Sequence, residues 1–338
     1  MNRGQRLFAP DALTRYPPGL DASKLAHRYT DTRLDSKGRQ IDFAGIKVML
    51  DSLKTDVARW YTEETGEKFN GYTLGSMIHA VRRKFWEDPR FEQVFTALEL
   101  DQGHIPKVQI PWWNEVGAAE LGHEYDATGV RVLLGPRHCI EAPQLTRAGV
   151  DSDVLAVAVT GMPKTSDGYL MVGLRGGVSY RNTYQVNGGA LGLTDEIKAG
   201  KISIYDFFKA KELIPETGIR DADIEKAEIC ARIMDESIDN GPQYLFLVHL
   251  RIDLQHMMER FEQNPHSSKA EHQCFVPVPA TVPGVLEFLK ENYRGLVANN
   301  EERGNHERRL LHSGAVALLT SVGLPLSELK AFYQDGVW

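Results

Sequence analysis

The chain of 338 residues has no long apolar run, few cysteines and no excess of positive charge. No apolar stretch approaches the roughly 18 residues that a membrane-spanning helix needs. The N-terminal sequence MNRGQRLFAP also lacks the apolar core of a signal peptide. These absences argue against a membrane protein and predict a cytoplasmic protein without a membrane partner.

The cysteines Cys139, Cys230 and Cys274 are odd in number and far apart in the sequence. None belongs to a CxxC motif or has a histidine at the spacing of a zinc site. A disulfide framework and a zinc centre are therefore not expected. Reduced thiols in the cytoplasm are the simplest interpretation.

The net charge of −7 is spread unevenly along the chain. Residues 1–150 carry 20 basic and 20 acidic side chains, whereas residues 151–338 carry 19 basic and 26 acidic ones. Nucleic-acid binding needs Lys and Arg to displace counterions, so general nucleic-acid binding is not expected. An acidic half suits a site that captures phosphates through a metal ion instead.

Length and composition favour a soluble protein with two domains, or with one domain that carries large extensions. Hydrophobic residues make up 42% of the chain and charged residues 25%, as in ordinary globular proteins. We divide the chain into an arm with a mainly helical region over 1–149, an α/β domain over 150–295 and a helical extension over 296–338. The predicted fold class is α+β.

The N-terminal part is predicted to be mainly helical beyond an extended arm over residues 1–40. Apolar residues recur at steps of three and four from Ile46 to Trp60, which predicts an amphipathic helix that ends near Gly66. Further helices are expected over 73–86 and in FEQVFTALEL, then an extended segment and a short strand VRVLLG. Trp112 and Trp113 fit either a buried aromatic pair or a platform for a base or sugar.

Strand signals strengthen from Asp153 onwards. VLAVAVTGM, a turn in TSDG and GYLMVGLR predict a hairpin whose second strand ends at Arg175. NTYQV then leads to Gly188 and Gly189, and a helical segment follows. IEKAEICARIMD, QYLFLVHLRI and HQCFVPVP predict three more strands, and VPGVLEFLKENY predicts a closing helix.

Residues 188–219 carry the strongest chemical signal. Glu212 and Glu216 are spaced i,i+4, so on a helix both carboxylates project from one face, about 6 Å apart at Cβ. Such a pair can hold a hard divalent cation, and Mg²⁺ selects oxygen ligands and bridges them to phosphates. Ser203, with Asp206 three residues later, predicts the start of the helix.

This stretch resembles the Nudix box, G-x5-E-x7-R-E-U-x-E-E-x-G-U, where U is apolar. Lys211 stands at the position of the family's Arg, Glu212 at the paired Glu and Glu216 at the last acidic position, and Gly218 and Ile219 close the motif. Two features depart from the pattern: Pro215 takes the first place of the acidic pair, and Lys211 follows Gly189 by 22 residues where the family has 14. Ser203 stands where the first family Glu would fall.

The resemblance covers about residues 150–295 and implies an α/β/α sandwich around a mixed sheet. It also implies that Mg²⁺, or Mn²⁺, is held by Glu212 and Glu216 for hydrolysis of a nucleoside diphosphate linked to another group. Lys211 would offer a cation to a glutamate or phosphate without the planar fork of Arg. Gly188 and Gly189 would let the backbone approach the metal or substrate.

Several assignments stay open. Arg175 fits either a strand-end ion pair or a contact to a substrate phosphate. Asp195, Glu196 or Glu271 could replace the carboxylate that Pro215 removes, although each alone is more often a solvated surface acid. His249 and His256 have no partner at a suggestive spacing and are assigned to structure.

Three functions remain in competition. The first is a metal-dependent Nudix hydrolase acting on a nucleotide-derived small molecule. The second is a Nudix-fold module that has lost hydrolysis and binds a nucleotide or a protein, which Pro215 and the stretched loop favour. The third assigns the main activity to residues 1–149, where we find no nucleophile, phosphate loop or metal cluster. Among the partners we include a second copy of the chain, in a homodimer.

Overall fold

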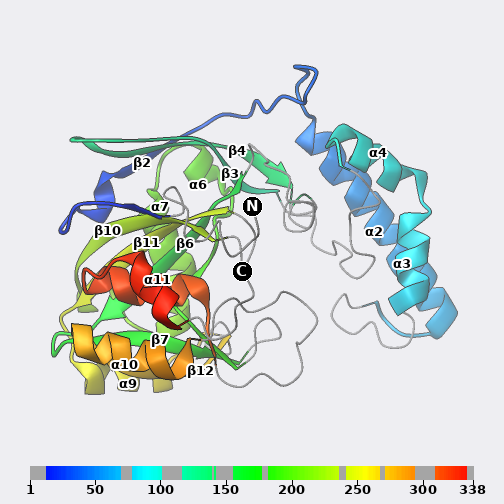
Figure 1. The fold of residues 1–338 in the computed structure, drawn as a ribbon. Helices are drawn as coiled ribbons and strands as arrows, with labels where there is room; N and C mark the ends of the chain where they lie inside the picture. Colours follow the sequence, from blue (N-terminus) through cyan, green and yellow to red (C-terminus); the bar gives the residue numbers. More distant parts are fainter. Residues whose placement is uncertain are drawn as a thin grey trace.

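The structure of the chain is a computed structural model that describes residues 13–69, 78–100, 116–138, 141, 155–176, 182–235, 241–266, 271–293 and 309–332. Trp112 and Trp113, and the start of the helix expected over 73–86, lie outside the described residues. The described part is a mixed α and β structure (Figure 1).

The larger sheet runs in the order β1, β10, β11, β6, β7, β8, β13, and β12 and β9 join it by pairing with β7 and β6. Its strands are β1 (Leu13–Arg15), β6 (Ala158–Lys164), β7 (Tyr169–Arg175), β8 (Thr183–Gln185), β9 (Asn187–Ala190), β10 (Ile224–Asp235), β11 (Gly241–Leu250), β12 (His272–Pro279) and β13 (Arg309–Leu310). The pairs β11–β6 and β13–β8 are parallel and the other pairs are antiparallel. The predicted mixed sheet is therefore confirmed.

Hydrophobic side chains fill both faces of this sheet. Along β11, Tyr244 and Phe246 belong to one hydrophobic core, while Leu245 and Leu247 belong to another. Successive side chains of a strand point to opposite faces, so the two cores lie on opposite sides of the sheet. This explains why QYLFLVHL is almost continuously apolar, as expected for a strand that is covered on both faces.

Different helices cover the two faces. The first core receives residues from α7 (Ile204–Phe208), α8 (Ile214–Thr217) and α9 (Leu254–Glu262). The second core receives residues from α10 (Val282–Asn292), α11 (His312–Ser321) and the 3₁₀ helix η8 (Leu326–Phe332). The short elements α6 (Asp195–Lys198), η1 (Ala22–Lys24) and η6 (Asp221–Asp223) complete this half.

A second sheet has the order β2, β4, β3, β5 and differs from the expectation of a mainly helical N-terminal region. It consists of β2 (Leu25–Tyr29), β3 (Val116–Asp126), β4 (Gly129–His138) and β5 (Leu155–Ala156). VRVLLG was expected as one short strand. It lies within the longer strand β4, which forms a long antiparallel hairpin with β3. The charged sequence HEYDATGVR does not predict this hairpin. The tip of the hairpin is exposed, and its residues do not alternate regularly between apolar and polar.

A buried polar network joins the two sheets. Glu120 of β3 accepts hydrogen bonds from Arg232 Nη2 at 2.5 Å and from the Tyr244 hydroxyl at 2.6 Å. Nearby, the Tyr16 hydroxyl and His123 Nε2 are 2.9 Å apart. Because Glu120 is buried, its charge needs these partners, and the network fixes how β3 lies against β10 and β11.

Three helices form a separate unit to one side of the sheets (Figure 1). They are α2 (Phe43–Thr65), α3 (Ile78–Trp86) and α4 (Pro89–Ala97). Their apolar faces enclose a third core that includes Ile46, Leu50, Leu53 and Val57, the stripe that the sequence predicts. Gly66 ends α2 with a left-handed φ of 70°, as expected for a helix C-cap.

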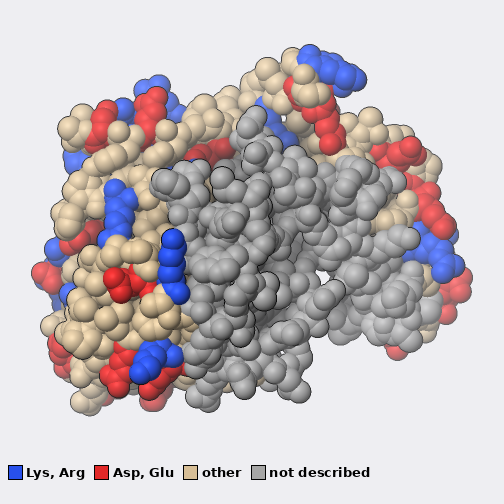
Figure 2. All heavy atoms as spheres, viewed as in Figure 1, with Lys and Arg blue, Asp and Glu red and all other residues tan. Residues whose placement is uncertain are grey.

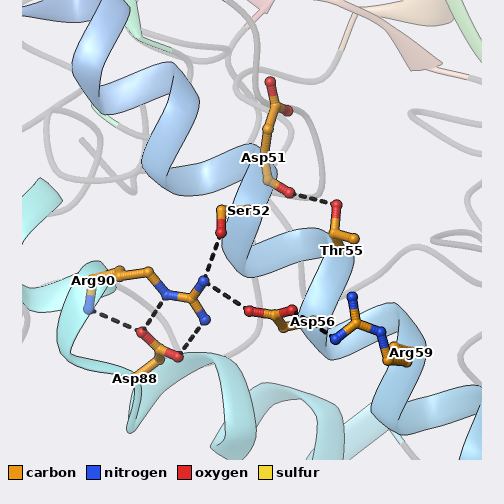
Figure 3. Close-up of polar contacts among 7 residues, drawn as sticks. All are labelled: Asp51, Ser52, Thr55, Asp56, Arg59, Asp88 and Arg90. Carbon is orange, nitrogen blue, oxygen red and sulfur yellow. Dashed lines mark hydrogen bonds and ion pairs between the residues drawn. The ribbon is translucent and has the colours of Figure 1, made fainter.

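Arg90 ties α4 to α2 (Figure 3). Its guanidinium donates to Asp88, the N-cap of α4, and its Nη1 donates at 2.8 Å to both Asp56 and Ser52 of α2. Asp56 also pairs with Arg59 at 3.2 Å. Arg90 therefore makes several hydrogen bonds at once with its planar fork, a role that lysine cannot fill.

Charges of both signs lie side by side on the described surface in Figure 2, where Lys and Arg neighbour Asp and Glu. None of the helices in the described ranges has both the length and the apolar character needed to cross a membrane. The larger sheet takes strands from all three predicted segments, because β1 and β13 lie outside 150–295. The three-part domain division and the homodimer stay predictions.

Replacing Arg90 should loosen the helical unit. We expect Arg90→Ala and Arg90→Lys to lower its free energy of unfolding by about 1 kcal/mol, because both lose the bridge from α4 to α2. Hydrogen exchange of peptides from α2 and α4 measures the change.

The matched control is Arg59→Ala, since Arg59 is exposed and its only ion pair among the described residues is with Asp56. This variant should change the free energy of unfolding of the helical unit, as measured by hydrogen exchange, by less than about 0.5 kcal/mol. Equal effects of the Arg59 and Arg90 variants would contradict a bridging role for Arg90.

Candidate functional site

The helix that carries the candidate acids begins as the sequence predicts. Ser203 is the N-cap of α7 and accepts from the Asp206 N–H at 3.0 Å, while the Asp206 carboxylate accepts from the Ser203 N–H. This capping box fixes the helix start. Gly218 ends α8 with a φ of +76°, and a Cβ there would lie 2.4 Å from the Arg260 carbonyl oxygen.

The middle of this helix widens into the π-helical turn η5 (Lys209–Leu213). The Ile214 N–H donates to the Lys209 carbonyl, five residues back. Pro215 follows at once, and it has no N–H to donate to the carbonyl of Lys211, so α-helical bonding is interrupted there. The helix is therefore distorted just before Pro215, in the turn that contains Glu212.

Glu212 and Glu216 lie beside each other as expected from their spacing. Glu216 is 1% exposed and Glu212 is partly buried. Burial, followed by the negative charges of Glu216 and Glu271, raises the pKa of Glu212 to about 8. A hydrogen bond with Glu216 acts in the same direction, while Arg175 lowers the pKa. At neutral pH, without a cation, Glu212 therefore holds a proton.

The glycine pair lies against this helix. Gly189 faces Glu212, since a Cβ at Gly189 would lie 2.8 Å from Oε1 of Glu212. Gly188 has a φ of +151°, and a Cβ there would lie 2.2 Å from the carbonyl oxygen of Val159. The backbone conformation and the close carbonyl thus require glycine at position 188, and glycine at 189 leaves room for the Glu212 carboxylate where it lies.

Arg175 and Glu271 lie at the same end of the site. Arg175 ends β7, and its Nη2 is 3.3 Å from the Glu271 carboxylate, so the strand-end ion pair is present. Both charges also act on Glu212. Arg175 Nε is buried and has no hydrogen-bond partner in the described part of the chain.

Three other candidate residues lie elsewhere. Lys211 is exposed and makes no ion pair among the described residues. The pKa of Glu196 is lowered mainly by hydrogen bonds from the backbone and from Thr194, and to a smaller extent by the charge of Lys211. Asp195 and Glu196 are exposed in the first turn of α6. The pairing of Glu212 or Glu216 with Lys211 is therefore not formed.

Sequence reasoning missed two residues that contact Glu216 directly. Asn187 Nδ2 donates to Oε2 of Glu216 at 2.7 Å, and His272 Nε2 is 3.1 Å from the same oxygen. Asn187 and His272 are both buried. The available signals were weak: Asn187 directly precedes the glycine pair, and His272 follows Glu271.

The histidines assigned to structure have ordinary partners. His249 Nε2 lies 3.1 Å from Glu228, and His256 Nδ1 lies 2.7 Å from Asp253, the N-cap of α9. Neither partner belongs to the candidate site. These contacts agree with a structural role for both histidines.

The residues present fit a divalent cation that is shared with a phosphate. Oε1 of Glu216 is buried without a hydrogen-bond partner among the described residues, and Glu212 lies next to it. Mg²⁺ commonly binds through one or two carboxylates and completes its shell with water and phosphate oxygens. Within the described ranges, no group of three or more His, Cys, Asp and Glu side chains is arranged to hold a metal by itself.

A cavity of about 1110 Å³ lies near the glycine strand. It is bounded by the start of α2, by β4 and by residues 192–198, and Tyr29, Phe43 and Lys198 line it. Sequence reasoning did not predict it, because its walls come from segments far apart in the chain.

Comparisons with known proteins give limited information. No protein-family model matches the chain, and no curated protein matches it. Among solved structures, the chain is similar to the protein DR0079 from Deinococcus radiodurans, with 14% identity over 43% of this chain and 77% of that chain. The TM-score is 0.28, which carries no argument about fold or function.

The raised pKa of Glu212 predicts how stability changes with pH. The unfolded chain loses this proton near pH 4.5, whereas the folded chain keeps it up to about pH 8. The free energy of unfolding should therefore fall as pH rises through this window. Glu212→Gln cannot ionise, so its stability relative to wild type should increase from pH 5 to pH 8, by at least about 1 kcal/mol.

Denaturant unfolding in the presence of a chelator measures this difference. Glu196→Gln is the control, because hydrogen bonds lower the pKa of Glu196 and its contribution changes only below pH 4.5. A stability difference for Glu212→Gln that stays constant from pH 5 to pH 8 would show that Glu212 is already ionised at neutral pH.

Proposed function

We propose that the chain is a metal-dependent hydrolase of the Nudix type that cleaves a nucleoside diphosphate linked to another group. The observation that carries the proposal is the pair formed by buried Glu216 and partly buried Glu212, in which Oε1 of Glu216 accepts no hydrogen bond from any other described residue. Helices on both faces of a mixed sheet support the α/β/α sandwich that belongs to this proposal.

Each nearby residue has a role in this proposal. A bound Mg²⁺ or Mn²⁺ would neutralise the diphosphate and lower the pKa of the attacking water. Glu212 and Glu216 would hold the cation, and Gly189 keeps the space beside Glu212 open. Arg175 Nε has no hydrogen-bond partner among the described residues and can donate to a phosphate oxygen. Glu271 supplies the nearby third carboxylate that could replace the one missing at Pro215.

The cavity supports a small-molecule substrate. Its volume is enough for a nucleotide-sized group, and Tyr29 and Phe43 offer aromatic surface for a base. Gly192 on its wall follows Gly189 by three residues, which is at most about 10 Å of extended chain. One substrate could therefore reach from the acids into the cavity.

The alternative is a binding module without hydrolysis. Pro215 favours it, because a carboxylate of the usual metal set is absent there. In this reading Glu212 and Glu216 still bind a cation and a nucleotide, but no water is activated.

Calorimetric titration of Mg²⁺ and Mn²⁺ tests the proposal, with a nucleoside diphosphate sugar present and product release followed in the same samples. We expect the wild type to bind metal and release product, and the double variant Glu212→Gln, Glu216→Gln to lose both. Glu196→Gln, an exposed acid outside the pair, is the control and should behave as wild type.

Two outcomes would change the conclusion. Metal binding without product would favour the binding module, and Pro215→Glu would then test whether the missing acid is the cause, since it adds a carboxylate three residues after Glu212. If the wild type binds neither metal, the hydrolase proposal is wrong.

A further inference from the structure

We infer that Asn187 and His272 are positioning residues that fix the orientation of the Glu216 carboxylate, so that only its Oε1 is left for a cation. This inference rests on the proposed function. It concerns two residues outside the box-like stretch, which come from β9 and β12 and meet at α8.

The hydrogen bonds around Glu216 are one-sided. Oε2 has two nitrogen neighbours, Asn187 Nδ2 at 2.7 Å and His272 Nε2 at 3.1 Å. Apart from the hydrogen bond that joins Glu216 to Glu212, Oε1 has no partner in the described part of the chain, although the residue is 1% exposed. An unpaired buried carboxylate oxygen is costly, so this atom needs a cation or a proton.

The protonation of the two partners follows from this geometry. A carboxylate oxygen accepts, so His272 must carry a hydrogen on Nε2, and the Asn187 amide must present its nitrogen. His272 Nδ1 is buried without a hydrogen-bond partner among the described residues. A neutral imidazole with hydrogen on Nε2 satisfies the observed contact and leaves no unpaired N–H.

Packing holds the imidazole in this position. A Cβ at Gly173 would lie 2.2 Å from His272 Nδ1, so the ring occupies space that only glycine leaves open. On the other side, the ring centroid is 5.0 Å from that of Phe275. The ring therefore cannot turn away from Glu216 without displacing backbone or an aromatic side chain.

The consequence concerns the cation. Carboxylate ligands of metals are themselves oriented by hydrogen-bond donors, and loss of such a donor typically weakens metal binding about 10- to 100-fold. With Oε2 held by two donors, Oε1 is the oxygen left for a cation that the neighbouring Glu212 shares. A merely structural role for Asn187 and His272 would change stability and leave the metal affinity of the folded protein unchanged.

Mn²⁺ binding to the full chain, measured by electron paramagnetic resonance, tests the inference without depending on activity. We expect His272→Phe and Asn187→Ala to raise the Mn²⁺ Kd about 10- to 100-fold. His272→Gln should bind within about threefold of wild type, because its amide nitrogen can replace Nε2 as donor. His249→Phe, a histidine paired with Glu228 outside the site, is the control and should not change the Kd.

Near-UV circular dichroism of the same samples gives the folded fraction. If either His272→Phe or Asn187→Ala does not fold, the other of these two variants and His272→Gln still test the inference. An unchanged Mn²⁺ Kd in folded His272→Phe or folded Asn187→Ala overturns the inference. The inference is also overturned if His272→Gln loses as much affinity as His272→Phe. If the wild type itself binds no Mn²⁺, the proposed function fails first, and the inference fails with it.

Discussion

Two carboxyl groups that lie side by side on the inner face of one helix set the main constraint on this fold. Glu216 is buried and Glu212 is partly buried, and burial together with the negative charge of Glu216 raises the pKa of Glu212. Their surroundings compensate: Asn187 and His272 donate to Glu216, and Arg175 brings positive charge. Such a costly arrangement is typical of functional sites, where stability is exchanged for chemistry.

The larger sheet gives this arrangement a rigid base. Gly189 on β9 and Gly173 on β7 leave room for Glu212 and for the His272 ring. The other face of β7 is covered by the core that α10 and α11 complete. The buried contacts of Glu120 with Arg232 and Tyr244 then lock the second sheet onto the first. The three-helix unit has its own core and contributes the start of α2 to the cavity wall.

Much of the sheet could be predicted from local sequence. The strands from Ala158 onwards are apolar runs separated by turn residues, and the Ser203 cap follows from a local motif. The short strands β1 and β13 could not be predicted, because three and two residues carry no periodic signal and pairing is set by distant partners. The long β3–β4 hairpin was missed for a similar reason, since its exposed tip is charged.

The residues of the candidate site also fall into those that local sequence could predict and those that it could not. Glu212, Glu216 and the glycine pair could be found because they share one stretch with a recognisable spacing. Asn187 and His272 could not, because 85 residues separate them and only the pairing of β7 with β12 brings His272 to the helix. Lys211 is exposed and makes no ion pair among the described residues, so its expected contact with a glutamate is not formed, while its contact with a phosphate stays a prediction.

The central claim is that Glu212 and Glu216 together hold a divalent cation. Anomalous diffraction from a crystal grown with Mn²⁺ and a non-hydrolysable nucleoside diphosphate analogue tests it most directly. We predict a metal peak about 2 Å from Oε1 of Glu216 and from a carboxylate oxygen of Glu212, bridged to a phosphate oxygen. An ordered nucleotide whose Mn²⁺ lies elsewhere, with both glutamates bare, would contradict the account.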